Sequence, residues 1–448
     1  MQACLSQIAR INPKVNAICT LLDQDQLLRR ARAADRQIGK SHAVGPLHGF
    51  PHAVKDLIPT AGIRTTYGSR IYRDNVPTED ALTVQRLKAA GAIIIGKTNT
   101  PEFGAGSQTF NAVFGVTRNP YDLSRTCGGS SGGAAVSVAC GMTPLADGTD
   151  LGGSIRNPSS FCNVVGFRPS IGRVPSWPRL QPWTSMSVDG PIARSVRDAA
   201  LMLSVIAGPD ARVPTAIDEP GSVFRGSLGR DFKGVPIAWS RNLGRYPVEP
   251  VVSDVFNSAR HVFADLGCRV RDDEPDFADA DEVFQTLRAW SFAEERGENL
   301  RQHRDLMKDT VIWNTEQGLR LTGADVSRAE VKRAALHRRV GAFLERHEFL
   351  VLPVSQVAPF PVEVEWVRDI NGMPMKTYID WMATCYAITL TGLPAISVPC
   401  GWTPGGLPVG LQIVGRHHRD LDVLKLAHAF EQATRLTGRR RPPVTSFV

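Results

Sequence analysis

The stretch that decides the fold class is EDALTVQRLKAAGAIIIG, residues 79–96. Leu82, Val84 and Leu87 give its first part a helical period, and Gly91 ends that helix. The apolar AIIIG that follows has the composition of a buried strand. A helix followed at once by a strand is the repeating unit of α/β layer folds.

The rest of the chain repeats this alternation. Further apolar strands are predicted in VPIAWS at 235–240, FLVLP at 349–353, AISVP at 395–399 and PVGLQIVG at 408–415. Helices are predicted over residues 1–40, with a stop near Gly39, and over 195–207, 251–266, most of 280–347 and 421–437. We therefore expect an α/β/α sandwich around a large twisted mixed β-sheet.

The composition is that of a globular protein. Of the 448 residues, 42% are hydrophobic and 21% are charged, which fits neither wholesale disorder nor a coiled coil. The net charge of +8 would suit an anionic partner, but basic residues alternate with acids along the chain. The densest basic run, at 439–441, is typical of a solvated tail. A nucleic-acid-binding module stays open as a non-enzymatic alternative.

Eight cysteines are scattered without a CxxC pair or a histidine spacing that would hold zinc. Reduced thiols in the cytoplasm are the simplest interpretation. The N-terminal MQACLSQIARINPK has polar and charged residues too early for a signal peptide, and no apolar run is long enough to span a membrane. We expect a soluble cytoplasmic protein without a metal or other cofactor.

A first candidate site is CGGSSGG, residues 127–133. Glycines on both sides of the serines let such a loop expose hydroxyls and point N–H groups into one space. The P-loop interpretation fails because no Gly-Lys-Ser/Thr follows. Gly128, Ser130 and Gly132 also match the G-x-S-x-G nucleophile elbow, while a flexible Gly/Ser turn remains the simplest alternative.

The second candidate, GTDLGGSIRNPSSFC at 148–162, places Ser154 behind two glycines. Successive N–H groups here can converge on a carbonyl oxygen that becomes negative in a transition state. These are the N–H groups of Leu151, Gly152, Gly153 and Ser154. Asp150 and Arg156 flank the turn with opposite charges and could hold it rigid, although a surface ion pair is the commoner fate of such residues.

A serine nucleophile needs a base, and none of the ten histidines lies in either glycine loop. A lysine can serve when burial lowers its pKa. Lys55 has that setting, because it follows the mostly apolar FPHAV, where a solvated lysine is unexpected. Most single lysines are surface residues, so this interpretation depends on all three segments together.

Together these segments resemble the amidase signature family. The similarity lies in GFPHAVKD at 49–56, CGGSSGGAA at 127–135 and GTDLGGSIRNPSSFCNVVGFRPS at 148–170, and further in GAIIIGKTNTPEF, VDGPIARSVRDAA, LTGLPAISVPCG and LPVGLQIVG. It extends over residues 1–437 and is weakest at 210–350. The resemblance implies the amidase signature fold, a single domain over 1–448, and a variable substrate region at about 210–350.

The resemblance also implies roles for individual residues. Ser154 attacks an amide carbonyl, Ser130 relays the proton, and neutral Lys55 accepts it, with a cis peptide bond before Ser130. The N–H groups of 151–154 form the oxyanion hole. Ser131, Asp150 and Arg156 match supporting positions that orient the triad.

Two other enzymes compete with this prediction. One is the glutamine-hydrolysing subunit of a tRNA-dependent amidotransferase, which shares the triad but needs partner proteins. The other is an α/β-hydrolase-like esterase that uses His428, which follows the serines in the required chain order.

The substrate is expected to be a small-molecule amide, without nucleic-acid or membrane partners, and a homodimer is left open. Candidate pocket residues are Phe103, Thr109, Trp177, Trp183, Val354 and Trp366. Trp177 and Trp183 could equally be core aromatics. An aromatic cleft would suit aryl or acyl amides, anilides or carbamates.

Overall fold

The computed structural model describes residues 1–38 and 44–446 and contains a mixed sheet of eight strands in the order β10-β9-β11-β15-β14-β7-β8-β6. Its strands are β6 (Leu145–Asp150), β7 (Val165–Arg168), β8 (Val188–Ala193), β9 (Pro236–Trp239), β10 (Arg269–Asp272), β11 (Phe349–Pro353), β14 (Ala395–Trp402) and β15 (Pro408–Gly415). β9 runs parallel to β10 and β11, and the other neighbours are antiparallel. The predicted large mixed sheet is confirmed.

A second sheet has three strands in the order β1-β3-β2. They are β1 (Ile18–Leu21), β2 (Pro51–Lys55) and β3 (Ile93–Thr98), and β2 runs parallel to β3. Two short hairpins pair β4 (Phe110–Asn111) with β5 (Gly115–Val116) and β12 (Asp369–Ile370) with β13 (Met373–Pro374).

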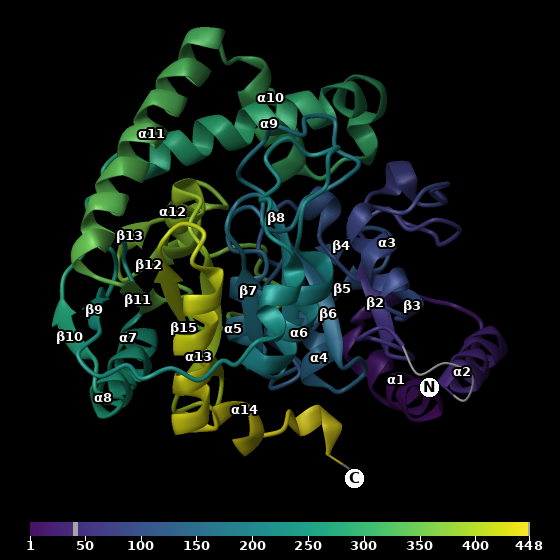
Figure 1. Cartoon of the computed structure of the whole chain (residues 1–448). Helices are drawn as coiled ribbons and strands as arrows, with labels where there is room; N and C mark the ends of the chain where they lie inside the picture. The colour runs from purple at the N-terminus through teal and green to yellow at the C-terminus, as the bar shows by residue number, and fades with distance from the viewer. Residues whose placement is uncertain (39–43, 447–448) are drawn as a thin grey trace.

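Helices cover both faces of the large sheet (Figure 1). Because side chains alternate along a strand, Ile237 and Trp239 of β9 face one core while Ala238 faces the other, and Val351 and Leu350 of β11 divide in the same way. The first core is closed by α3 (Leu82–Ala89), α6 (Val196–Ile206), α7 (Pro250–Ser258), α8 (Arg260–Asp265) and α13 (Asp420–Thr434). The second is closed by α9 (Ala280–His303), α11 (Gly323–Arg346) and α12 (Ala383–Thr391).

The remaining helices complete the frame. They are α1 (Gln2–Val15), α2 (Gln24–Ile38), α4 (Gly132–Ala139), α5 (Arg156–Phe161), α10 (Asp309–Leu319) and α14 (Leu436–Arg439). Figure 1 shows α9, α10 and α11 together along one side of the molecule. No helix within 1–38 or 44–446 is both long and apolar enough to cross a bilayer.

Three predicted boundaries were wrong. The helical segment 1–40 is interrupted by β1, a strand too short for its pattern to stand out, and the predicted stop at Gly39 lies outside the described residues. The helix predicted at 251–266 breaks after Ser258 into α7 and α8. The last long helix ends at Thr434 because Arg435 adopts a left-handed conformation with φ 52°.

The two sheets meet edge to edge. β2 is an outer strand of the small sheet, β6 is an outer strand of the large one, and the two strands are in contact. Helix α4 packs against β2, β3 and β6 together. The candidate catalytic residues predicted from the sequence lie at this junction.

Candidate active site

Lys55 ends β2, and its side chain is completely buried. Its Nζ lies 2.8 Å from Ser130 Oγ, 2.8 Å from Ser131 Oγ and 2.9 Å from Thr149 Oγ1. All three hydroxyls can accept a hydrogen bond from the amine, and each can also donate to it when the lysine is neutral. The structure therefore brings Lys55 and Ser130 together as the sequence predicted.

Burial lowers the pKa of Lys55 to about 7, against an opposing effect of the nearby carboxylates of Asp147, Asp150 and Asp189. An ammonium group loses its hydration in this setting, which disfavours the charged form. A large fraction of the amine is therefore neutral near neutral pH. Lys55 can then accept a proton from a hydroxyl in contact with it.

Two neighbouring side chains hold the loop that carries Ser130 through hydrogen bonds to its backbone. The Gly129–Ser130 peptide bond is cis. Ser107 Oγ donates to the Gly129 carbonyl oxygen at 2.6 Å, and Thr109 Oγ1 donates to the Gly128 carbonyl oxygen at 2.8 Å. Thr109 thus supports the serine loop from its buried side.

Ser154 lies in the turn that follows β6, and its carbonyl oxygen accepts the Ser131 N–H at 3.1 Å. The Gly153 N–H donates to Asp150 Oδ1 at 2.9 Å. Among the described residues, no hydrogen bond occupies the N–H groups of Leu151, Gly152 and Ser154, or Ser154 Oγ. Three backbone donors of the turn and the Ser154 hydroxyl are therefore available to a ligand.

Asp150 and Arg156 are buried together rather than paired at the surface. Arg156 Nη2 lies 3.0 Å from Asp150 Oδ1, and Arg168 Nη1 lies 3.2 Å from the same oxygen. Burial alone would raise the pKa of Asp150, but the two guanidinium groups outweigh it and hold that pKa well below its usual range. The turn is anchored on a permanent carboxylate.

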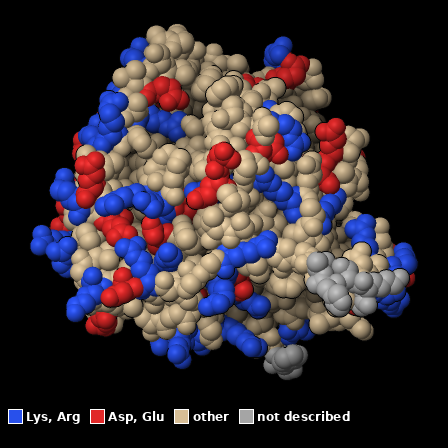
Figure 2. All heavy atoms as spheres, viewed as in Figure 1, with Lys and Arg blue, Asp and Glu red and all other residues tan. Residues whose placement is uncertain are grey.

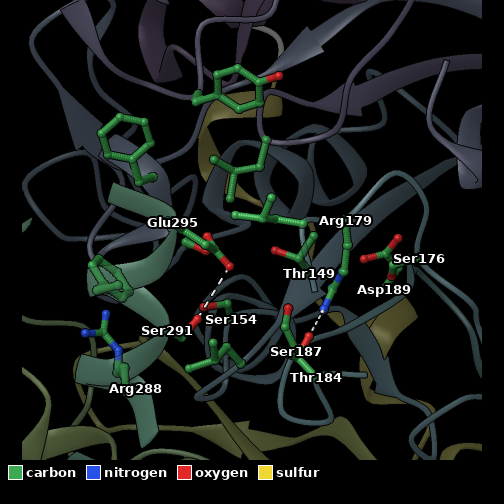
Figure 3. A pocket seen from close by; sticks show the side chains of 18 of the residues that line it. Thr149, Ser154, Ser176, Arg179, Thr184, Ser187, Asp189, Arg288, Ser291 and Glu295 are labelled. Carbon is green, nitrogen blue, oxygen red and sulfur yellow. Dashed lines mark hydrogen bonds between the residues drawn. The ribbon is translucent and has the colours of Figure 1, made fainter. Parts of the chain in front are cut away.

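Ser130, Thr149 and Ser154 open into a cavity of about 380 Å³. Figure 3 shows Ser291 and Glu295 on one side of Ser154, and Arg179, Ser176 and Asp189 on the other. The apolar lining residues include Leu57, Tyr67, Phe103, Trp177, Phe284, Phe292 and Met382. The nucleophile candidate thus faces a cavity in which aromatic and polar side chains are intermixed.

Of the predicted pocket residues, Phe103 and Trp177 line this cavity. The structure places Trp183 on the surface with 72% of its area exposed, and Thr109 behind the serine loop. Val354 lies in the core, where its carbonyl oxygen accepts from Thr384, and Trp366 stacks under the Arg368 guanidinium. Bulk and aromaticity alone did not separate a cavity wall from a surface or core position.

Several residues at the site were missed by the sequence analysis. Thr149 contacts Lys55 although 94 residues separate them, and Asp147 accepts the Lys55 backbone N–H at 3.0 Å. Helix α9 supplies Phe284 and Phe292 to the cavity wall. The only signal for Thr149 and Asp147 was their alternation in LADGTD, which places them on one face of a strand.

His428 lies on α13 and does not line the cavity of Ser130 and Ser154. Its Nδ1 lies 3.8 Å from Glu431 Oε2, one turn further along the helix. The arrangement therefore does not place it as a base for either serine.

The large mixed sheet between helical layers holds a buried Lys-Ser pair beside a glycine-rich serine turn, and this arrangement is that of a candidate hydrolase. The sequence model of the family described as Amidase matches residues 1–424, and the chain belongs to this amidase family.

Known relatives agree with this assignment. An acylamidase of Rhodococcus erythropolis is 37% identical, over 98% of this chain and 92% of its own length. A glutamyl-tRNA(Gln) amidotransferase subunit from Moorella thermoacetica is 35% identical, over 98% and 93%. The crystal structure of a bacterial aryl acylamidase of the amidase signature enzymes superposes with a TM-score of 0.90 at 29% identity, covering 98% of this chain and 94% of that one.

Proposed function

We propose that this amidase hydrolyses a carboxylic amide through a seryl acyl-enzyme, with Ser154 as nucleophile, Ser130 as proton relay and Lys55 as base. The observation that carries the proposal is the contact of 2.8 Å between Lys55 Nζ and Ser130 Oγ, buried at the cavity that Ser154 also lines. A serine is a weak nucleophile until a neighbouring base takes its proton, and a buried neutral amine can do so.

In the first step, Ser154 Oγ bonds to the carbonyl carbon while its proton passes through Ser130 to Lys55. The carbonyl oxygen becomes negative and is stabilised by the N–H groups of the turn at 151–154. Within this oxyanion hole, Gly153 is the member that already binds Asp150, so Leu151, Gly152 and Ser154 are the donors that reach the substrate. The proton then passes to the nitrogen of the leaving group, and the C–N bond breaks. Water next hydrolyses the acyl-enzyme, which releases the acid and restores the Ser154 hydroxyl.

The cavity favours an amide with an aryl or other apolar group. Phe103, Trp177 and two residues of α9, Phe284 and Phe292, contribute to the lining. Flat apolar groups bury well against such rings. An aryl or acyl amide, an anilide or a carbamate is the proposed substrate, in keeping with the names of the acylamidase relatives. The segment 210–350, which contains α9, is the proposed substrate-selecting region of a single domain.

The relatives that are glutamyl-tRNA(Gln) amidotransferase subunits support glutamine hydrolysis as a second candidate. That activity would release ammonia for partner proteins. It ranks lower because the cavity lining near Ser154 combines several aromatic rings, which a small zwitterionic amide does not fill.

The test is a hydrolysis screen of p-nitroanilides, primary amides, carbamate esters and free glutamine, with Ser154→Ala as the blank. We expect the highest kcat/KM on an anilide or another aryl amide. Turnover of glutamine above all other substrates would favour the second candidate. Turnover that persists in Ser154→Ala would refute the triad.

We also propose that the protein is a cytoplasmic enzyme, monomeric or homodimeric, that needs no cofactor and binds neither nucleic acid nor membrane. Figure 2 shows Lys and Arg intermixed with Asp and Glu over one face, with no uniform basic surface in that view. A gel-retardation assay at low salt and the mass in solution by light scattering test these points.

A further inference from the structure

His52 and Asp147 form a buried pair directly behind Lys55. His52 Nε2 lies 2.7 Å from Asp147 Oδ1, and both side chains are almost entirely buried. The proposed hydrolysis assigns no step to either residue. A carboxylate buried in the core is costly unless hydrogen bonds or charges compensate it.

The second oxygen of Asp147 reaches the backbone of the base. Oδ2 accepts the Lys55 N–H at 3.0 Å. β2 is an outer strand of its sheet, so this N–H points away from the β3 ladder and needs another acceptor. Asp147 supplies that acceptor from β6, the facing edge of the other sheet.

The same face of β6 also holds the far end of the lysine. Asp147 and Thr149 are two residues apart on the strand, so their side chains project to the same side. Thr149 Oγ1 contacts Lys55 Nζ at 2.9 Å. One face of β6 therefore fixes both the main chain and the amine of Lys55.

We propose that Asp147, held by His52, is a positioning residue that fixes the backbone of Lys55 and places a permanent negative charge near its amine. This inference rests on the proposed role of Lys55 as the base.

Charged groups on β2, β3 and β8 act on Asp147, namely Lys55, Lys97 and Asp189. Asp150 of β6 and Asp189 of β8 also act on Lys55. Burial opposes the ionisation of Asp147, but His52, the Lys55 N–H and Lys97 together hold the pKa of Asp147 below its ordinary value. The carboxylate in turn raises the pKa of Lys55 against the larger effect of burial. Loss of this charge should favour the neutral amine at lower pH.

The test uses phenylmethanesulfonyl fluoride, so it does not depend on knowing the natural substrate. Ser154 Oγ bonds to sulfur, the S–F bond breaks, fluoride leaves, and the serine proton passes to the base. The rate constant of this modification is followed by intact-protein mass spectrometry as a function of pH. Its rising limb reports the ionisation of the coupled Lys-Ser-Ser unit.

Asp147→Asn keeps an oxygen for the Lys55 N–H but removes the charge. We expect the midpoint of the limb to move to lower pH by about one unit. His52→Gln retains an amide donor for Asp147 and should keep the parent midpoint. An unmoved midpoint in Asp147→Asn with a parent-like thermal transition would overturn the inference, and a His52→Gln shift equal to that of Asp147→Asn would overturn the donor role of His52.

His52→Leu covers the case in which Asp147→Asn does not fold. Without its donor the buried carboxyl takes up a proton more readily, so the midpoint should again move to lower pH. A parent-like midpoint in His52→Leu would then overturn the inference.

The matched control is another His–Asp pair, at the end of α11. His347 Nε2 lies 2.8 Å from Asp273 Oδ2, and neither residue lines the cavity. Asp273→Asn should leave the midpoint of the rising limb unchanged. A shift like that of Asp147→Asn would show that the effect is not specific to Asp147 and would overturn the inference.

The Lys55→Ala variant distinguishes failure of the proposed function from failure of the role given to Asp147. If Lys55→Ala is sulfonylated as fast as the parent, the proposed triad itself fails. If Lys55→Ala is inert and Asp147→Asn has the parent midpoint, only the positioning role of Asp147 fails.

Discussion

Arg156 and Asp150 form a completely buried ion pair at the base of the turn that carries Ser154, with Nη2 3.0 Å from Oδ1 and Nε 3.1 Å from Oδ2. Asp150 also accepts the N–H groups of Gly153 and Ile155, at 2.9 and 3.2 Å. The carboxylate that Arg156 neutralises in the core is therefore the same group that fixes the conformation of the turn.

Arg156→Ala should destabilise the protein by about 3 kcal/mol, because it removes one of the cations that compensate a buried carboxylate. It should also lower turnover, since the turn loses its anchor. Urea unfolding and the rate of anilide hydrolysis measure the two effects. The control is Arg212→Ala, which breaks a more exposed pair with Asp210 and should cost much less stability, because water screens an exposed ion pair. Equal losses in the two variants would contradict this prediction.

Ser154→Ala should abolish hydrolysis, because no other group in the turn can form the acyl-enzyme. Its thermal transition should stay near that of the parent, since the hydroxyl makes no hydrogen bond among the described residues. Ser258→Ala, at an exposed hydroxyl at the end of α7, is the control and should keep full activity. More than trace activity in Ser154→Ala would exclude this serine as the nucleophile.

The pH dependence of kcat/KM should show a limb that rises with pH and has its midpoint near the Lys55 pKa of about 7. The sign follows from the role of the base, which must be neutral to accept a proton and is neutral only above its pKa. Lys55→Ala should cost several orders of magnitude and remove the limb. His428→Ala should retain it, and loss of the limb in that variant alone would favour the esterase alternative.

Gly153→Ala should inactivate the enzyme. Gly153 has φ +111°, which side-chain-bearing residues rarely adopt, and an added Cβ would lie 2.5 Å from Cys385 Cβ. Movement of the turn would displace the oxyanion donors, and a loss of about 100-fold or more in kcat is expected. Gly323→Ala is the control, because its added Cβ meets no neighbour within 4 Å. Full activity in Gly153→Ala would show that the turn tolerates rearrangement.

Dialysis against EDTA should leave activity unchanged. Within residues 1–38 and 44–446, no three His, Cys, Asp or Glu side chains are grouped so that they could hold a metal ion. The measurement is turnover before and after dialysis, then with added zinc. Activity that falls and returns with zinc would contradict the prediction.

The sequence was most informative where the chemistry depends on local backbone shape. Ser130 and Ser154 each lie in a glycine-rich loop whose conformation is encoded within a few residues. Lys55 could be recognised because a charged residue at the end of an apolar strand is unusual. The predicted sheet followed from apolar runs such as 349–353, which are buried on both faces.

Contacts between distant segments could not be predicted in the same way. Thr149 and Asp147 reach Lys55 only after two sheets pack edge to edge, and no local pattern specifies that packing. Trp177 and Trp183 have similar surroundings in the sequence, yet one lines the cavity and the other is exposed. Their difference arises from the tertiary course of the loop.

Under the proposed mechanism, hydrolysis requires β2 and β6 to meet, so activity reports that the two sheets have assembled. Lys55 belongs to the three-stranded sheet, whereas Ser154 follows β6, an edge strand of the eight-stranded sheet. Either sheet could regain its hydrogen-bond ladder during refolding while the amine and the hydroxyls were still far apart. After dilution from denaturant, the rate at which turnover recovers therefore measures the docking of the two sheets. The rate at which the circular dichroism signal recovers measures their formation.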